Sequence, residues 1–313
     1  MRIVFLGTPH YAVPVLSTLF DARYEVAAVV TQPDRPAGRG RALASPPVAV
    51  WAREHGVPVL QPPSLRPPEV AEQIAALAPD AMVVASYGRI LPPPLLALAP
   101  MGCLNVHPSL LPRHRGPSPV AEAILEGESV TGVTVMLIDE GMDTGPIVAQ
   151  EEVAIGPDDT AGALTASLFA RGGELMARTL REWSEGRIEA IPQSETQATY
   201  SRKLEKADGE LDFTRTAAQL HNQVRAMHPW PGACTTFKGA TLKVIRSTRQ
   251  PSTGAADPPG TVIVLHGAPA PIGVVTRDGV LGLLELQLEG RRAANTDAFL
   301  RGHPDLLGTR LPC

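Results

Sequence analysis

The first half of the chain alternates short apolar segments with segments of helical spacing, and this alternation constrains the fold more than any other feature. Nearly continuous apolar runs predict buried strands at residues 2–6, 26–30, 57–60, 80–85 and 102–106. Helical spacing of apolar residues predicts helices at 13–21, 48–55, 69–77 and 118–126. Strands that alternate with helices are typical of a mostly parallel α/β sheet. Ligands of such sheets bind beyond the carboxyl ends of the strands.

The same domain is expected to continue to residue 188. Residues 130–138 alternate apolar and polar side chains and predict a strand that pairs with 147–154 across the loop 139–146. Helical spacing continues from 160 to 185. Residues 186–208 then lose all periodicity, which predicts a linker at 189–207.

The last third of the chain, residues 208–313, has a different pattern. A helix is predicted over 214–227, and it must end before Pro229 and Pro231 because proline interrupts helices. Short β-like runs follow at 234–237, 241–246, 260–265, 272–276 and 280–288, separated by turn residues. Several short strands of this kind indicate a small β-barrel.

Charge is distributed unevenly between these two parts. The chain has 313 residues and a net charge of −4. Residues 1–200 hold 14 arginines, no lysine and 22 acidic residues, whereas residues 201–313 hold 14 basic and 10 acidic residues. This asymmetry permits a basic face on the second part for an anionic partner, although ordinary solvated charge explains it equally well.

Several classes of function are disfavoured by what the sequence lacks. It has no apolar run of the roughly 18 residues that a membrane span needs. Gly7-Thr8-Pro9 follows the first strand without completing a dinucleotide-binding glycine pattern, and no P-loop motif occurs. Its three scattered cysteines fit neither a disulfide framework nor a CxxC zinc site, which favours a reducing cytoplasm.

Asn105, His107 and Asp143 together offer the chemistry of acyl transfer. In an extended segment residues i and i+2 point the same way, so Asn105 and His107 are expected to face one cavity. An amide can donate to an oxyanion, an imidazole can carry a proton, and a carboxylate can orient that imidazole. A bare N-x-H is more often a capping asparagine and a surface histidine. However, the long strings at 105–112 and 139–146 are too specific for chance.

These strings resemble those of the folate-dependent formyltransferases, and within them the branch that acts on methionyl-tRNA. The resemblance extends over essentially the whole chain and includes residues 5–9, 31–40, 87–92, 228–232 and 285–290. It implies a Rossmann-like catalytic domain, mostly parallel α/β, followed by an OB-like barrel that binds tRNA. It also implies that the chain transfers the formyl group of 10-formyltetrahydrofolate to methionyl initiator tRNA.

The resemblance assigns roles to three sets of residues. Asn105, His107 and Asp143 would be catalytic. The residues at the tetrahydrofolate site would be Ser109, Leu110, Leu111 and Pro112, together with Arg89, Ile90 and Leu91 of a second segment. A basic, glycine-containing loop with Arg35, Arg39 and Arg41 would grip the acceptor end of the tRNA through phosphates that guanidinium groups match.

The match is not complete. His114 stands where relatives often have an aromatic residue, and Pro117 and Ser118 stand where two small residues are common. A zinc site built from His107, His114 and Asp143 is disfavoured because the seven-residue gap fits no standard ligand pair. We therefore expect no metal ion. We also expect a monomeric protein that acts in the cytoplasm and has no membrane partner.

Three other functions remain open at this point. A sugar-nucleotide formyltransferase and a 10-formyltetrahydrofolate hydrolase would share the catalytic trio. The first would need a nucleotide pocket, and the second often carries a further dehydrogenase domain. A non-catalytic tRNA- or folate-binding protein would have no need of an intact trio.

Overall fold

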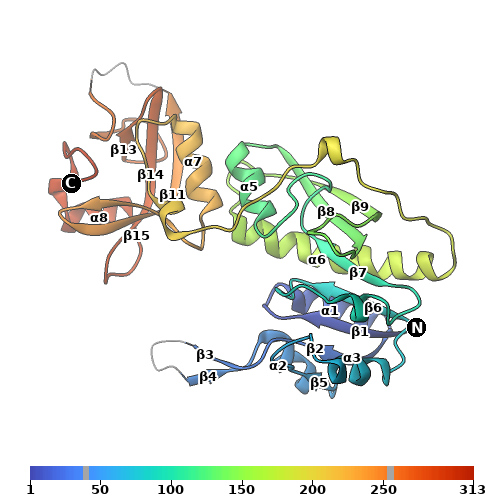
Figure 1. Ribbon diagram of the computed structural model, residues 1–313. Coiled ribbons are helices and arrows are strands. Elements are labelled where there is room, and N and C mark those ends of the chain that lie inside the picture. The colour runs from blue at the N-terminus through green and yellow to red at the C-terminus, as the bar shows by residue number, and fades with distance from the viewer. Residues whose placement is uncertain (38–41, 252–256) are drawn as a thin grey trace. The chain divides into compact units, whose positions relative to one another are not determined.

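The computed structural model describes residues 1–37, 42–251 and 257–313, which form two compact units (Figure 1). The first unit comprises residues 1–119, 130–154 and 165–201, and the second comprises 120–129, 155–164 and 202–313. Residues 187–201, most of which the sequence assigns to a linker, therefore belong to the first unit. The domain boundaries at 188 and 208 stay a prediction.

A seven-stranded sheet is the centre of the first unit, with the order β5-β2-β1-β6-β7-β8-β9. The first five strands of this order are parallel, β8 is antiparallel to β7, and β9 is antiparallel to β8. This arrangement confirms the predicted α/β class with a mostly parallel sheet. The strands are β1 (Arg2–Gly7), β2 (Glu25–Val30), β5 (Val59–Leu60), β6 (Ala81–Ala85), β7 (Cys103–His107), β8 (Val130–Leu137) and β9 (Ile147–Ala154).

Helices cover both faces of this sheet, which explains the continuous apolar runs of its parallel strands. On β1, Ile3 and Phe5 pack into one core and Val4 and Leu6 into another, as the period of two requires. Three helices pack on the first face: α1 (Ala12–Asp21), α2 (Pro47–Glu54) and residues 165–184 of α6 (Ala161–Ser184). Two pack on the second: α3 (Pro68–Ala75) and α4 (Pro93–Leu96).

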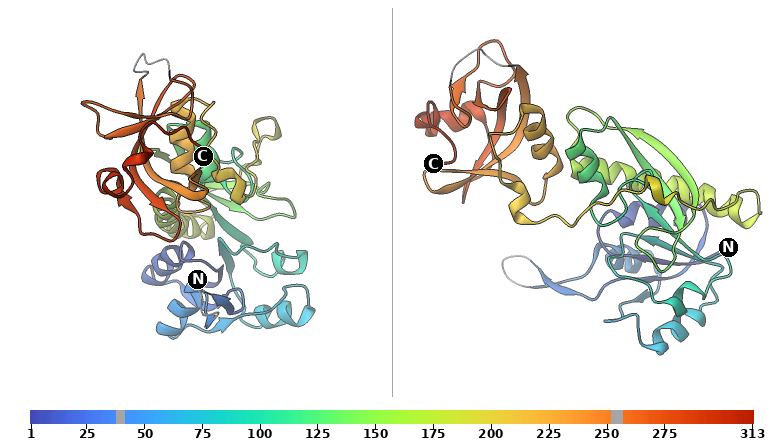
Figure 2. Two further views of the ribbon diagram at one scale, coloured as in Figure 1. Left: turned by 90° about the vertical axis from the view of Figure 1, so that its left-hand side faces the viewer. Right: turned by 45° about the horizontal axis from the view of Figure 1, so that its top comes forward.

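A short hairpin projects from the first unit, as Figure 2 shows. It consists of β3 (Arg35–Ala37) and β4 (Ala42–Ala44), which are antiparallel. The sequence predicts only an exposed basic loop here, because strands of three residues carry no measurable periodicity and one of them contains Pro36. Of the basic residues assigned to this loop, Arg35 lies in β3, whereas Arg39 and Arg41 lie outside the described residues.

The second unit is rich in antiparallel strands, as predicted. Its sheet has the order β10-β11-β14-β13-β12, and β15 pairs with β14. The strands are β10 (Ala233–Phe237), β11 (Ala240–Pro251), β12 (Val262–Val264), β13 (Ile272–Val275), β14 (Gly279–Leu288) and β15 (Ala294–Asn295). The helices are α5 (Pro119–Glu126), most of which lies in this unit, α7 (Ala217–Ala226) and α8 (Thr296–Gly302). Of these three helices, only α8 is not predicted from the sequence.

The C-terminal segment 308–313 connects the two edges of this sheet. The backbone N–H of Val262 in β12 donates to Thr309, and the N–H of Cys313 donates to Thr236 in β10, each at 2.9 Å. Edge strands that are paired in this way present few free backbone groups to other chains. Both edges are thus covered, as in a barrel.

Short helical turns and loops complete the two units. The 3₁₀ turns are η1 (Glu195–Gln197), η2 (Lys206–Gly209) and η3 (Pro304–Leu306). Within the described ranges, none of the helices combines the length and the apolarity that crossing a membrane would require.

Candidate active site

Strand β7 positions Asn105 and His107 on one face of the sheet. Its alternate residues Leu104 and Val106 pack into the core on the side of α6, so Asn105 and His107 face the other way. β7 pairs in parallel with β6 and in antiparallel fashion with β8. Asn105 is half-buried, and His107 is almost fully buried at 4% exposure. The structure therefore places the amide and the imidazole on the same face of the sheet.

Both ring nitrogens of His107 face acceptors. Nε2 lies 3.1 Å from the backbone oxygen of His114, and Nδ1 lies 3.7 Å from Oδ1 of Asp143. A neutral imidazole can donate from only one nitrogen, whereas an imidazolium donates from both. The distance of 3.7 Å is an ion-pair distance but longer than a hydrogen bond.

Asp143 lies on the loop between β8 and β9, and backbone groups hold its carboxylate. The N–H of Gly116 donates to Oδ2 at 2.8 Å. The backbone of Asp143 has φ 54°, a left-handed conformation that non-glycine residues rarely adopt. Nearby, a Cβ on Gly145 would overlap the carbonyl oxygen of Leu137, so only glycine fits there. The loop is thus shaped by positions that tolerate little variation.

A residue that the sequence analysis did not identify also holds this loop. The side-chain amide of Gln193 donates to the carbonyl oxygens of Asp143, at 2.8 Å, and Gly145, at 2.7 Å. Its Oε1 accepts a hydrogen bond from Nε of Arg115 at 3.0 Å. No sequence pattern marks Gln193, because it follows the last helix of the first unit in an aperiodic segment.

The segment 109–112 is held by hydrogen bonds of Ser109 and by hydrogen bonds to Thr134 on β8. Ser109 is fully buried, and its hydroxyl donates to the carbonyl oxygen of Arg113 at 2.7 Å. Thr134 on β8 accepts from the N–H of Leu111 and donates to the carbonyl oxygen of Ser109. Leu111 is 3% exposed, and Leu110 packs against Gly132. These side chains therefore shape the segment, and Pro112 is half-buried beside them.

The segment 87–91 is anchored from three sides and exposes one large apolar side chain. The carbonyl oxygen of Tyr87 accepts hydrogen bonds from Thr8 and Gln32. Arg89 donates to the carbonyl oxygen of Pro63 at 2.6 Å. Leu91 is buried in the core, whereas Ile90 is 87% exposed. Burial raises the pKa of the Tyr87 hydroxyl, so this phenol stays neutral.

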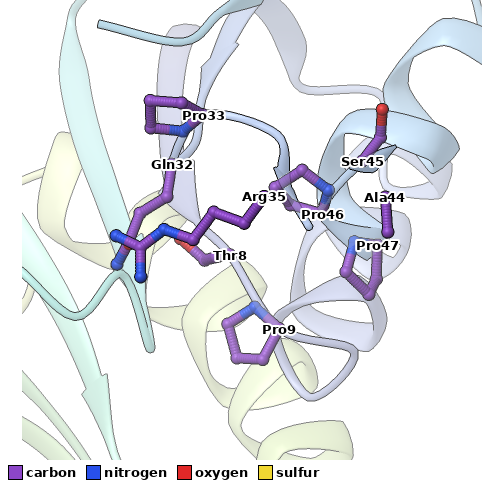
Figure 3. A pocket seen from close by; sticks show the side chains of 9 residues that line it. All are labelled: Thr8, Pro9, Gln32, Pro33, Arg35, Ala44, Ser45, Pro46 and Pro47. Atoms are coloured by element: carbon purple, nitrogen blue, oxygen red, sulfur yellow. The ribbon is translucent and has the colours of Figure 1, made fainter. Parts of the chain in front are cut away.

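A pocket lies at the base of the hairpin, and its lining includes residues that follow β1 and β2 (Figure 3). It has a volume of about 230 Å³. Figure 3 shows Arg35 and Gln32 side by side, and the guanidinium donates to Oε1 of Gln32 at 2.8 Å. Gln32 in turn reaches Tyr87, so a hydrogen-bond chain links the hairpin to the segment 87–91. The lining residues are Thr8, Pro9, Gln32, Pro33, Arg35, Ala44, Ser45, Pro46 and Pro47.

Comparisons with known proteins identify related chains over the full length. A family model described as formyl transferase matches residues 1–180, and a model of the formyl transferase C-terminal domain matches residues 203–304. The methionyl-tRNA formyltransferase of Chloroflexus aggregans is 49% identical over 304 residues, which cover 96% of this chain and 97% of that one. The enzyme of the same name from Myxococcus xanthus is 47% identical, with coverages of 96% and 95%.

Solved structures of lower identity share the fold. A sugar 3N-formyl transferase, WlaRD, solved with dTDP and 5-N-formyl-THF, matches with a TM-score of 0.65 and 18% identity, covering 93% of this chain and 99% of that one. HypX from Aquifex aeolicus, in complex with tetrahydrofolic acid, matches with a TM-score of 0.63 and 18% identity, covering 96% of this chain and 47% of that one. At this identity the likeness concerns the fold alone.

Proposed function

The chain belongs to the formyl transferase family, and we propose that it transfers a formyl group from 10-formyltetrahydrofolate to the α-amine of methionyl initiator tRNA. The single observation that carries the proposal is the identity of 49% over nearly the whole length of a methionyl-tRNA formyltransferase. The geometry of His107 between Asp143 and the His114 carbonyl supports it.

The proposed reaction is a direct transfer without a covalent enzyme intermediate. The neutral α-amine attacks the formyl carbon and forms a new C–N bond, which leaves a tetrahedral oxyanion. Asn105 and the charged His107 donate hydrogen bonds to this oxygen, each contributing about 10²–10³-fold to the rate, as in other oxyanion holes. The bond from carbon to N10 of the folate then breaks, and the proton lost by the amine is gained by N10.

Asp143 has two tasks in this scheme. Its negative charge stabilises the imidazolium of His107, which lies 3.7 Å away. It would also relay the proton from the amine to N10 through water. Binding both substrates in a reactive orientation would supply much of the remaining rate acceleration.

Two segments are proposed to line the folate site. The segment of Arg89, Ile90 and Leu91 offers backbone groups and the exposed Ile90 side chain, which suits the flat face of a pterin. The segment 109–112 is the second. The N–H groups of Ser109 and Leu111 already donate within the protein, whereas Leu110 and Pro112 are half-buried and would supply apolar contacts.

The hairpin and the second unit are proposed to bind the tRNA. Arg35, Arg39 and Arg41 would contact phosphates of the acceptor end, and basic side chains of residues 201–313 would contact further phosphates. The five acidic residues of segments 120–129 and 155–164 leave the second unit as a whole without a net positive charge. We further propose a monomer that acts in the cytoplasm without a metal ion or a membrane partner. Burial raises the pKa of the Cys103 thiol to about 12, which keeps this thiol uncharged.

The test compares three acceptors with the same formyl donor. Methionyl initiator tRNA, a sugar-nucleotide amine and a sample without acceptor are each incubated with the protein and 10-formyltetrahydrofolate. Transfer to the charged tRNA alone is the expected result. Transfer to the sugar, or formate release without an acceptor, would assign the protein to another branch of the family, and inactivity with all three would favour a binding protein.

A further inference from the structure

We propose that Gln193 is a positioning residue for Asp143, and that Arg115 holds Gln193 in place; this inference rests on the proposed function. All three hydrogen-bonding contacts of the Gln193 amide are made to protein groups. Both bonds of its Nε2 end on the Asp143 loop, at 2.8 and 2.7 Å, and its Oε1 accepts from Arg115. The amide therefore acts on substrate only through the loop that carries the carboxylate.

Arg115 is a fully buried guanidinium that the proposed chemistry does not use. It is 0% exposed, and besides Gln193 it donates to both carboxylate oxygens of Glu195, at 3.0 and 2.8 Å, and to the hydroxyl of Tyr200 at 3.0 Å. A buried charge needs partners of this kind to be stable. The hydrogen bonds from Arg115 also hold the pKa of Glu195 below its usual range, so this pair stays charged at neutral pH.

These partners lie on one segment, residues 191–201, which we call the strap. Its first residue pairs with Ile147 at the start of β9 through two backbone hydrogen bonds of 2.8 and 2.7 Å. Near its other end, the N–H of Arg115 donates to Thr199 and the N–H of Ser201 donates to Arg115. The strap is thus bound to the segment 114–116 and, through Ile147, to the end of the loop 139–146. These two segments flank the pair of His107 and Asp143.

The two flanking segments provide the contacts that orient this pair. The segment 114–116 supplies the carbonyl oxygen that faces Nε2 of His107 and the N–H that binds Asp143. The loop 139–146 supplies Asp143 itself, in a left-handed backbone conformation that persists only where its surroundings hold it. Besides Asp143 itself, Gln193 is a second side chain that joins the two, since it bonds Arg115 on one side and the Asp143 loop on the other.

The experiment removes the two donors of Gln193. Gln193→Glu keeps the size of the side chain and the acceptor for Arg115, and Gln193→Leu removes all polar groups. Each variant is expected to lower kcat for formyl transfer by about 10- to 100-fold, because small displacements of catalytic groups have effects of this size. The KM values for folate and tRNA should change less than about 3-fold, because the amide contacts neither substrate.

The chain offers a matched control in the second unit. Nε2 of Gln223 also donates to two backbone carbonyls, those of Asp208 and Glu210, and its Oε1 also accepts from an arginine. Gln223→Leu should lower thermal stability about as much as Gln193→Leu, with kcat nearly unchanged. A double variant separates positioning from general weakening: in an Asp143→Ala background, Gln193→Leu should cause little further loss.

The outcomes are distinct. Equal effects of Gln193→Leu and Gln223→Leu on kcat, or a further loss of 10-fold or more in the Asp143→Ala background, would overturn the inference while the wild type stays active. If Gln193→Leu does not fold, Gln193→Glu decides the matter on the same criteria. An inactive wild-type protein in the same assay would overturn the proposed function and the inference with it.

Discussion

At the scale of single residues, the account depends on the position of His107. Its ring lies between the carbonyl oxygen of His114 and the carboxylate of Asp143, so each of its two nitrogens faces an acceptor. The sequence indicates the three side chains but not this carbonyl, because a backbone acceptor leaves no mark in the residue types. The sequence marks His114 only as a departure from its relatives, whereas the structure places its carbonyl oxygen 3.1 Å from Nε2 of His107.

Asn105→Ala and Asp143→Ala should each lower kcat by about 10²-fold or more, since each removes a group that acts in the transition state. Affinity for tRNA should stay nearly unchanged, because neither side chain belongs to the proposed tRNA contacts. Steady-state kinetics and a filter-binding assay measure the two quantities. As a control, His55→Ala, at an exposed position, should leave both intact. Parallel losses of binding and turnover would contradict the assigned roles.

Gly145→Ala should destabilise the protein by about 2 kcal/mol or more, because the new Cβ would overlap the carbonyl oxygen of Leu137, which is backbone and cannot turn away. Activity should fall as well, since the strained loop carries Asp143. Urea denaturation measures the free energy of unfolding. The matched control is Gly302→Ala at the end of α8, where no atom lies within 4 Å of the new Cβ and the change should be near neutral. Equal effects of the two changes would refute the steric argument.

At the scale of elements, the structure differs from the sequence expectation where periodicity is weak. The parallel strands were predictable because both faces of the sheet are covered by helices, so their apolar runs are continuous. The hairpin β3–β4 was not, because each of its strands has three residues. The strap was not either, because its residues are ordered by individual hydrogen bonds to Arg115 and to the Asp143 loop rather than by a repeating apolar face.

Arg39→Ala should weaken the use of charged tRNA by the enzyme. The slope of the logarithm of tRNA affinity against the logarithm of salt concentration should decrease by about one, as expected for one lost phosphate contact. The measurement is the KM for methionyl-tRNA between 50 and 200 mM salt, a range chosen from the salt dependence of such contacts. Arg178→Ala on α6 removes an exposed guanidinium elsewhere and serves as the control. An unchanged salt dependence in the Arg39→Ala variant would contradict a contact between this loop and the tRNA.

At the scale of the whole molecule, each unit has its own core and its own determinants of stability. The second unit buries His221, whose Nδ1 lies 3.0 Å from the hydroxyl of Ser247 and whose Nε2 lies 3.2 Å from the carbonyl oxygen of Pro157. Its pKa is lowered, first by burial and further by the nearby charge of Arg225. These partners could not be foreseen, because Ser247 and Pro157 lie on segments distant from His221 in the sequence.

This lowered pKa predicts a loss of stability in acid. The unfolded chain binds a proton at His221 below pH of about 6.5, whereas the folded unit does not until a lower pH. Stability should therefore be lost as the pH falls from 7 towards 5. Thermal unfolding of the wild type and of His221→Gln at both pH values tests this, and the variant should lose less between them. An identical pH dependence of the two proteins would show that His221 is not involved.

The most direct test of the central claim is a single-turnover experiment with enzyme in excess over methionyl initiator tRNA and saturating 10-formyltetrahydrofolate. The wild type should convert the tRNA to its formylated form with one tetrahydrofolate released per formyl group transferred. His107→Ala, shown to be folded by circular dichroism, should form the same complex but transfer at least about 10²-fold more slowly. Formylation at an undiminished rate by His107→Ala, or no formylated tRNA from the wild type, would contradict the account.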